Sequence, residues 1–319
     1  MLTEARFWII MEGVKVPCSE YTPPRGIPSS GTVKNGRRMP VKLCIRAHDL
    51  GVMGIGGIVS RLEELGIDGI QLVCYKAYED IPQKPGAITA EKAAAIGEAF
   101  REKGVAVPLV GAYFNPVHSD PQKRQQGFEI FSDYLRHCKS LGCPVVGSET
   151  GSYNDDSWTY NPRNRTEEAH RTVAETFSRL CDIAREQGAV VAMEGASGHV
   201  CHDVKTLAKV RRMMGKPTRV IFDLYNYLDQ ENQRQYLQIL EEGIETFGKD
   251  ILLFHMKDCC FREGAPAKQV PFGTGEMDKR AILGRIKAHD PDAVLVLEET
   301  VGADIPLAVK TIREIWEQV

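Results

Sequence analysis

The sequence has 319 residues, of which 43% are hydrophobic and 26% charged, a composition typical of a globular protein with a sizeable core. Lysine and arginine number 40 against 43 aspartates and glutamates, which gives a formal net charge of −3. This balance argues against a protein that binds nucleic acid through an excess of positive charge.

The nine cysteines are odd in number and form no Cys-x-x-Cys pair. This pattern is typical of reduced thiols and not of a disulfide framework or a structural zinc site. No apolar run approaches the roughly 20 residues that span a bilayer, and the N-terminus lacks the features of a signal peptide. We therefore expect a cytoplasmic protein without a membrane contact, and a homo-oligomer is compatible with this composition.

Residues 1–38 differ from the rest of the chain. They contain a short apolar run at 7–10, followed by a stretch rich in proline, glycine and serine, and they show no sustained hydrophobic period. We expect an N-terminal arm of irregular structure here, with the folded domain beginning at residue 39.

From about residue 41 onward, short apolar runs alternate with longer segments of helical spacing, and the alternation occurs eight times. The runs lie at 43–45, 69–73, 106–110, 145–147, 189–193, 220–222, 251–254 and 293–297. Each run is apolar on both faces. Strands of this kind belong to parallel sheets that are covered by helices on both sides.

Three of the intervening segments carry clear helix signals. Asp120 and Pro121 form a capping residue followed by a proline at the first helical position, and the apolar stripe that follows ends near Gly142. Apolar residues also recur at spacings of three and four within 173–184 and within 309–319. We predict a helix in each of these three segments.

Eight strand-helix units without a Gly-x-Gly-x-x-Gly turn favour an α/β fold of the closed (β/α)8 type, a TIM barrel, over an open doubly wound sheet. We predict a single catalytic barrel domain over residues 39–319. The alternative is an open sheet divided into two halves.

In such barrels the active site lies at the carboxyl ends of the strands. Four polar residues directly follow the predicted strands five to eight: Glu194, Asp223, His255 and Glu298. Because these strands are neighbours around the barrel, we expect the four side chains to converge. Each residue alone also has an ordinary explanation, such as a rim ion pair or a helix cap, so the prediction depends on their joint occurrence.

Three carboxylates and one imidazole suit one divalent metal ion, with Mn²⁺ the first choice and Co²⁺, Mg²⁺ or Zn²⁺ as alternatives. Glu298 is followed by Glu299, and neighbours on a strand point to opposite faces, so only one of them faces inward. If Val294 and Val296 face the barrel interior, Glu298 faces it too, because every second residue of a strand points to the same side.

Three further residues near strand ends are candidates for substrate binding. Glu149 ends the fourth predicted strand, Phe114 follows the third, and His199 lies in the loop after the fifth. A carboxylate and an imidazole can bond to sugar hydroxyls, and an aromatic ring can pack against the apolar face of a sugar. A purely structural role remains open for each of them.

The order Glu, Asp, His, Glu on strands five to eight, with the segments 255–258 (His-Met-Lys-Asp) and 271–275 (Pro-Phe-Gly-Thr-Gly), resembles the xylose-isomerase-like barrel superfamily. The resemblance covers about residues 41–319. It is strongest to sugar phosphate isomerase/epimerase proteins similar to D-tagatose 3-epimerase, so it implies a small sugar or cyclitol as substrate.

The resemblance also implies roles for the four strand-end residues. All four would bind the metal. Glu194 and Glu298 would also be catalytic, while Asp223 and His255 would act only as ligands. One glutamate would remove a proton next to the carbonyl of a ketose or cyclitol, a cis-enediolate would form, and the second glutamate would return a proton. Inversion or isomerisation at one carbon follows.

The sequence departs from the epimerase pattern at one position. The relatives commonly carry Asp-x-x-His after the sixth strand, whereas this chain carries Asn226 three residues after Asp223. Asn226 can still bond a sugar hydroxyl. Lys257 is a candidate to stabilise an enediolate oxygen, and a simple ion pair with Asp258 is the alternative. Arg262 is the nearest candidate for the arginine that holds substrate in the relatives.

Several alternatives remain. A lyase of the same superfamily, such as an inosose dehydratase or a C-glycoside-cleaving subunit, would use the same four residues. A DNA-repair nuclease resembling endonuclease IV is disfavoured, because it needs further histidines, one of them at the position of Asn226, and clustered positive charge. A barrel that only binds ligand, or a subunit that needs a small partner, is also open. A free sugar is favoured over a sugar phosphate, because no Gly-rich phosphate loop is evident.

Overall fold

The computed structural model describes residues 8–11, 14–17 and 42–319 and divides the chain into two compact units, 1–30 and 31–319. In the first unit, strand β1 (Trp8–Met11) pairs antiparallel with β2 (Val14–Pro17). The rest of the irregular arm predicted over residues 1–38 lies outside the described residues.

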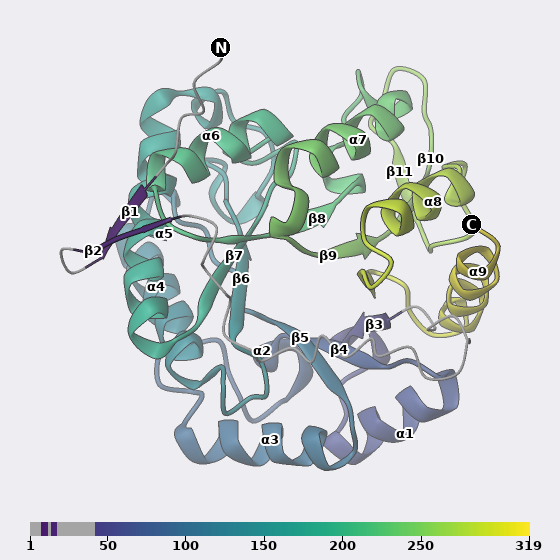
Figure 1. The fold of residues 1–319 in the computed structure, drawn as a ribbon, viewed down its shortest axis with the longest axis horizontal. Helices are drawn as coiled ribbons and strands as arrows, with labels where there is room; N and C mark the ends of the chain where they lie inside the picture. The colour runs from purple at the N-terminus through teal and green to yellow at the C-terminus, as the bar shows by residue number, and fades with distance from the viewer. Residues whose placement is uncertain (1–7, 12–13, 18–41) are drawn as a thin grey trace. The chain divides into compact units, whose positions relative to one another are not determined.

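The second unit contains a closed barrel of eight parallel strands (Figure 1). These are β3 (Lys42–Arg46), β4 (Gly69–Leu72), β5 (Ala106–Gly111), β6 (Val145–Glu149), β7 (Val190–Glu194), β8 (Arg219–Asp223), β9 (Ile251–Met256) and β12 (Val294–Leu297). The strands pair in chain order, and β12 closes the barrel against β3. The predicted (β/α)8 barrel is confirmed, and each predicted apolar run overlaps one of these strands.

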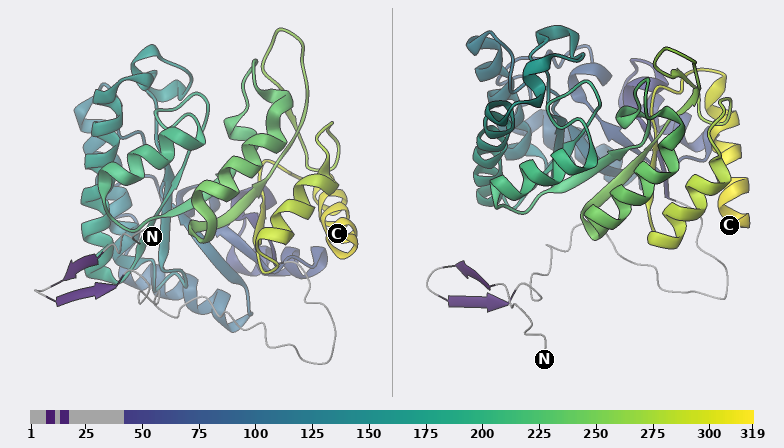
Figure 2. Two further views of the ribbon diagram at one scale, coloured as in Figure 1. Left: turned by 45° about the horizontal axis from the view of Figure 1, so that its top comes forward. Right: turned by 90° about the horizontal axis from the view of Figure 1, so that it is seen from above.

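Helices surround the strands on the outside of the barrel, as the turned views of Figure 2 also show. They are α1 (Ile55–Leu65), α3 (Ala90–Glu102), α4 (Pro121–His137), α5 (Glu167–Gln187), α6 (Val204–Met214), α7 (Tyr236–Phe247), α8 (Lys279–His289) and α9 (Asp304–Gln318). A short helix, α2 (Cys74–Ala77), follows β4. Among the described helices, none has the length and apolar character that a membrane crossing would require.

All three predicted helices are present, as α4, α5 and α9, and two of them show an end signal expected from the sequence. The Asp120 side chain accepts a hydrogen bond from the backbone N–H of Gln122 at 2.7 Å, and Pro121 opens α4. Helix α5 ends at Gly188, whose φ of 58° is left-handed, as is usual for a glycine at this position. Local sequence signals therefore mark where α4 begins and where α5 ends, whereas α4 ends at His137, before the predicted stop near Gly142.

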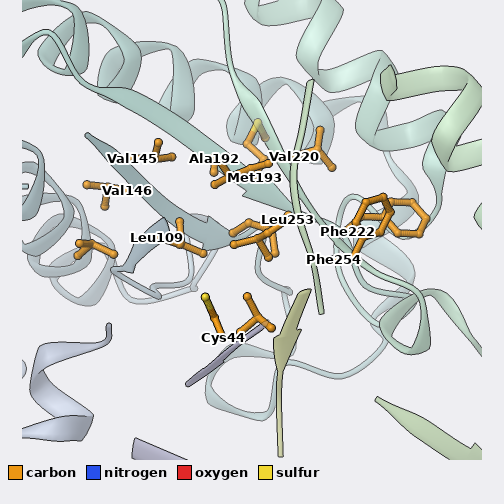
Figure 3. Packing of buried hydrophobic residues seen from close by; sticks show 14 of the residues in the cluster. Cys44, Leu109, Val145, Val146, Ala192, Met193, Val220, Phe222, Leu253 and Phe254 are labelled. Atoms are coloured by element: carbon orange, nitrogen blue, oxygen red, sulfur yellow. The ribbon is translucent and has the colours of Figure 1, made fainter. Parts of the chain in front are cut away.

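Side chains from different strands fill the barrel interior, and a glycine makes room for them. A Cβ on Gly147 would lie 2.6 Å from Cδ1 of Ile221 and 3.0 Å from Cδ1 of Leu109, so any other residue here would force these side chains to shift. Figure 3 shows this core with Leu109, Ala192 and Leu253 from three different strands. Side chains alternate along a strand, so the residue two positions after an interior residue also faces the barrel interior. Near the end of a strand, that residue lies at the carboxyl-end mouth of the barrel.

The cysteines are structural in this part of the chain. The eight that lie in the described residues are free, and all except Cys260 are buried. Cys259 and Cys260 are neighbours on β10 (Asp258–Cys260), which forms a hairpin with β11 (Lys268–Val270) after β9. The hairpin lies in the loop that follows the strand carrying His255.

Candidate metal centre and active-site pocket

The barrel brings the four predicted metal ligands together at its mouth. Glu194 and Asp223 are the last residues of β7 and β8, His255 lies near the end of β9, and Glu298 directly follows β12. Each offers one ligand atom, and these atoms all lie within 4.8 Å of one another. All four residues are buried, with Asp223 fully enclosed.

The choice between Glu298 and Glu299 is visible in the structure. Glu298 is 8% exposed and belongs to the cluster, whereas Glu299 is exposed and its backbone takes a left-handed φ of 51°. This conformation is uncommon for a residue other than glycine. It follows directly after a candidate metal ligand, where the chain leaves β12.

The imidazole of His255 lies at the centre of the cluster. Its Nδ1 lies 2.5 Å from Oε2 of Glu298, 3.3 Å from Oε1 of Glu194 and 3.5 Å from Oδ2 of Asp223. Because one nitrogen faces three carboxylates, His255 presents Nδ1 as its potential ligand atom.

The donor set fits a divalent cation. Oδ2 of Asp223 and Oε2 of Glu298 are buried and accept no hydrogen bond within the described residues, although each lies within ion-pair distance of a nitrogen. The three carboxylates lie among the ammonium of Lys257 and the guanidinium of Arg46, and Arg46 also pairs with Asp49. With His255 neutral, as a metal ligand would be, these groups carry a formal charge of −2. A buried cluster of this charge needs compensation, and one divalent ion supplies it.

The two glutamates have different proton affinities without a metal. Burial raises the pKa of Glu194 to about 7, although His255 partly offsets the effect. Burial also opposes ionisation of Glu298, but the nearby His255 and Lys257 outweigh it and hold the pKa of Glu298 well below its usual range. Carboxyl groups whose environments separate their pKa values in this way are suited to act as an acid and a base.

Gln71 is a site residue that the sequence analysis missed. It lies fully buried on β4, and its Oε1 lies 2.7 Å from Nε2 of His255. Its own Nε2 donates a hydrogen bond to the hydroxyl of Tyr113 at 2.8 Å. Its position within a short apolar strand could have indicated a site residue, because a buried side-chain amide needs polar partners nearby.

Arg46 and Asp49 were also missed. The guanidinium of Arg46 donates to Oε1 of Glu298 at 2.7 Å and makes two bonds to Asp49, at 2.8 and 2.9 Å. Oδ2 of Asp49 in turn accepts the backbone N–H of Glu299 at 2.9 Å. Arg46 ends the first barrel strand, as the predicted ligands end theirs, so its position could have indicated a role at the site.

Asn226 and Lys257, both predicted to bind substrate, lie between the cluster and the open pocket. Nδ2 of Asn226 donates to Oε1 of Glu194 at 2.9 Å, and Nζ of Lys257 donates to Oδ1 of Asn226 at 3.0 Å. Burial alone would lower the pKa of Lys257, but the charges of Asp223 and Glu298 raise it above its usual value. Lys257 therefore carries its positive charge at the centre of the site.

A cavity of about 650 Å³ opens above the cluster. Six of the predicted site residues line it: Phe114, Glu149, Glu194, Asn226, Lys257 and Glu298. Glu149 ends β6 in register with Glu194 on β7, and burial raises its pKa to about 7. The cavity therefore joins the candidate metal centre to a set of polar side chains that can reach a small ligand.

The remaining predicted residues take different positions. His199 is 5% exposed and lies behind the lining, with Nδ1 3.9 Å from Oε1 of Glu149. Phe114 has one edge on the cavity but packs mainly against Phe131 and Phe177, with ring centroids 5.9 and 6.2 Å away. Arg262 is exposed and is not among the described residues that line the cavity; its backbone bonds to the side chain of a neighbouring glutamine.

Comparison with known proteins gives a family. A family model described as xylose isomerase-like TIM barrel matches residues 59–316. A comparison with curated protein sequences gives no significant match. Among solved structures, a D-tagatose 3-epimerase-like protein is similar, with 17% identity and a TM-score of 0.66 over 88% of this chain and 98% of that one.

Two further solved structures have a similar fold. The IOLI protein with a binding zinc atom has 15% identity and a TM-score of 0.64, covering 87% of this chain and 96% of its own. The probable 3-DHS dehydratase AsbF from Bacillus anthracis has 13% identity and a TM-score of 0.62, covering 88% and 99%. At such identities the likeness shows the fold.

Proposed function

The chain belongs to the xylose isomerase-like TIM barrel family, and on that basis we propose that it is a metal-dependent isomerase or epimerase of a ketose or cyclitol. One observation carries the proposal: three buried carboxylates and an imidazole converge at the floor of a cavity large enough for a sugar. Buried ionisable groups of this kind in a cavity mark a functional site.

Four residues would hold the ion: Glu194, Asp223, His255 and Glu298. A bound divalent ion would polarise the substrate carbonyl and increase the acidity of the neighbouring C–H. Mn²⁺ is our first choice, because oxygen ligands dominate the set and one imidazole completes it. The zinc of the similar IOLI structure supports a divalent ion in a barrel of this fold.

Two glutamates would move the proton. Glu298, which pairs with the cations Arg46 and Lys257, would be ionised and would remove a proton next to the carbonyl. Glu194, which is buried and held by Asn226, would return one. They come from β12 and β7, with β8 and β9 between them, so they can reach a substrate from two sides.

Neighbouring side chains would orient this pair. Arg46 holds one oxygen of Glu298, and Asn226 holds one oxygen of Glu194. Lys257 lines the cavity with a retained positive charge, so it can stabilise the oxygen that becomes negative when the proton leaves. Glu149 also faces the cavity and would bond a substrate hydroxyl.

A lyase is the second candidate, and Glu149 is the observation that favours it. Glu149 is a third carboxyl on the cavity wall, and its raised pKa keeps part of it protonated at neutral pH. It could protonate a hydroxyl β to the carbonyl, so that water leaves as the C–O bond breaks. The dehydratase among the similar structures supports this candidate.

The experiment is proton exchange in D₂O. The metal-loaded protein is incubated with ketoses and inososes, and deuterium incorporation and products are followed by NMR. We expect deuterium at one carbon next to the carbonyl and an epimer or isomer as product, with exchange lost in Glu194→Gln and Glu298→Gln. An unsaturated product would select the lyase. No exchange with any of these substrates would overturn both candidates.

A further inference from the structure

The cavity is larger than one sugar ring requires. Its volume is about 650 Å³. A water molecule takes about 30 Å³ in the liquid, so a six-carbon sugar, equal in volume to roughly six waters, fills well under half of it. The cavity extends from Glu194 and Glu298 to residues of α4 and of the loop after β6, among them Gln126, Ile130 and Trp158.

Three side chains connect the metal centre with Trp158: Glu149 and Trp158 line the cavity, and His199 lies behind the lining between them. Glu149 is in register with Glu194 and faces the cavity. Nδ1 of His199 lies 3.9 Å from its carboxylate and is buried without a hydrogen-bond partner among the described residues. The ring of Trp158 meets the His199 ring edge-on, with centroids 5.4 Å apart. Carboxyl, imidazole and indole therefore follow one another outward from the cluster.

The loop holds Trp158 in an uncommon conformation. Its backbone φ is 51°, in the left-handed region that disfavours residues other than glycine, and Asp155 has the same value. Side-chain hydrogen bonds fix the loop: Nδ2 of Asn115 donates to the carbonyl of Ser152 at 2.7 Å, and Nδ2 of Asn164 donates to the carbonyl of Gly198 at 2.7 Å. Such strain persists where surrounding contacts determine it, which is common at ligand sites.

The charges of the cavity favour an uncharged ligand in its outer part. Four lysine and arginine side chains line it, and three of them are already paired. Arg46 pairs with Asp49 and Glu298, Lys257 with the cluster, and Lys123 with Asp156 at 2.6 Å. A phosphate would need cations free to bind it. The fourth cation, Lys76, lies over the ring of Tyr113, with Nζ 5.8 Å from its centroid. Beside the Lys123–Asp156 pair, the outer part offers an indole ring and the amide of Gln126.

We infer that the substrate is a keto sugar that carries a second, uncharged ring, as in a ketose disaccharide or a keto-glycoside. The reacting ring lies at the metal centre, and the second ring lies between Trp158 and Gln126. The indole provides the flat apolar surface that packs against the C–H face of a sugar ring. This inference rests on the proposed function and adds the substrate class to it.

The test fills the outer cavity and leaves the metal centre intact. Gln125 and Gln126 are both exposed residues of α4, but only Gln126 lines the cavity, whereas Gln125 bonds to Glu129 on the same helix. Gln126→Trp and Gln125→Trp therefore form a matched pair. Binding of D-fructose and of the ketose disaccharides turanose, maltulose and isomaltulose to the metal-loaded, full-length protein is measured by calorimetry.

We expect at least one disaccharide to bind about tenfold more tightly than D-fructose to the wild type, a ratio typical of one added ring contact. Gln126→Trp should remove this difference without weakening D-fructose, and Gln125→Trp should keep it. Trp158→Gly, which removes the ring and relieves the backbone, should act like Gln126→Trp. Equal binding of both sugar classes by the wild type, or an equal loss for both in Gln126→Trp, would overturn the inference.

Deuterium exchange in the same samples separates this inference from the proposed function. Exchange with D-fructose, without any preference for disaccharides, would leave the proposed function intact and overturn the two-ring substrate. A disaccharide preference that depends on Gln126, without exchange on any sugar, would support the two-ring ligand and contradict the proposed chemistry.

Discussion

Oε1 of Gln71, on β4, lies 2.7 Å from Nε2 of His255, on β9, and joins two strands that lie apart in the barrel order. Because the amide nitrogen of Gln71 donates to Tyr113, its oxygen is left to accept, so Nε2 of His255 carries the proton. With a metal ion bound, Nδ1, which faces the carboxylates, would be the unprotonated nitrogen. Gln71 thereby fixes the imidazole in its ligand form.

Gln71→Leu should weaken metal binding by about 10- to 100-fold, the usual effect of removing the partner of a metal-bound histidine. Chelator competition measures the affinity. Tyr113→Phe is the control, because it removes the outer end of the chain and leaves the bond to His255. Equal losses in both variants would contradict the assigned role of Gln71.

Lys257→Met should lower the rate of proton exchange about 10²- to 10³-fold, because it removes a buried positive charge at the site of developing negative charge. Bound metal should remain, since Lys257 is not one of the four candidate ligands. Lys268→Met, at an exposed lysine of β11, should leave the exchange rate unchanged. Wild-type exchange in Lys257→Met would rule out this role.

The buried carboxyl group of Glu149 should make the stability of the metal-free protein depend on pH. Burial and then the charge of Glu298 raise its pKa from 4.5 to about 7 in the folded state. Between these two values the unfolded chain loses the proton first, so stability falls as the pH rises through this window and stays low above it. Glu149→Gln removes this loss.

The metal-free Glu149→Gln protein should therefore be more stable than the wild type at pH 8, by about 1–3 kcal/mol, and equally stable at pH 4. Thermal unfolding at both pH values gives the comparison, with Glu245→Gln on the exposed face of α7 as the control. A difference of the same size at pH 4 and pH 8 would assign the effect to packing and not to ionisation.

Replacing Asp258 should lower the stability of the fold. Its fully buried carboxylate accepts backbone N–H groups of Gly275 at 2.8 Å and Cys259 at 2.9 Å and pairs with Lys279 at 2.9 Å. Asp258→Asn places an amide donor among these donors, so it should destabilise the protein by about 2–4 kcal/mol. Denaturant unfolding measures this, and the exposed Asp292→Asn should stay within about 0.5 kcal/mol of the wild type.

The sequence predicted the barrel because each strand is short and apolar on both faces, and because helix caps such as Asp120 are local signals. It also indicated the four candidate ligands, since in a closed parallel barrel the residue at the end of each strand faces the same mouth. Pattern and period are sufficient for features of this kind.

The partners of these residues could not be predicted in the same way. Gln71 and His255 are 184 residues apart, and Arg46 and Glu298 are 252 apart, so no local pattern joins them. The exposed position of Arg262 depends on the β10–β11 hairpin, whose direction the sequence did not show. Contacts across the barrel follow from register and loop path, which single-sequence reasoning does not supply.

The most direct test of the account is the metal content of the purified protein. We predict one divalent ion per chain after dialysis, lost in Asp223→Asn and in His255→Gln. His289→Gln, at the end of α8, should retain it, because this histidine lies outside the cluster. Retention of the ion by His255→Gln with wild-type affinity, or no bound divalent ion in the wild type, would contradict the account.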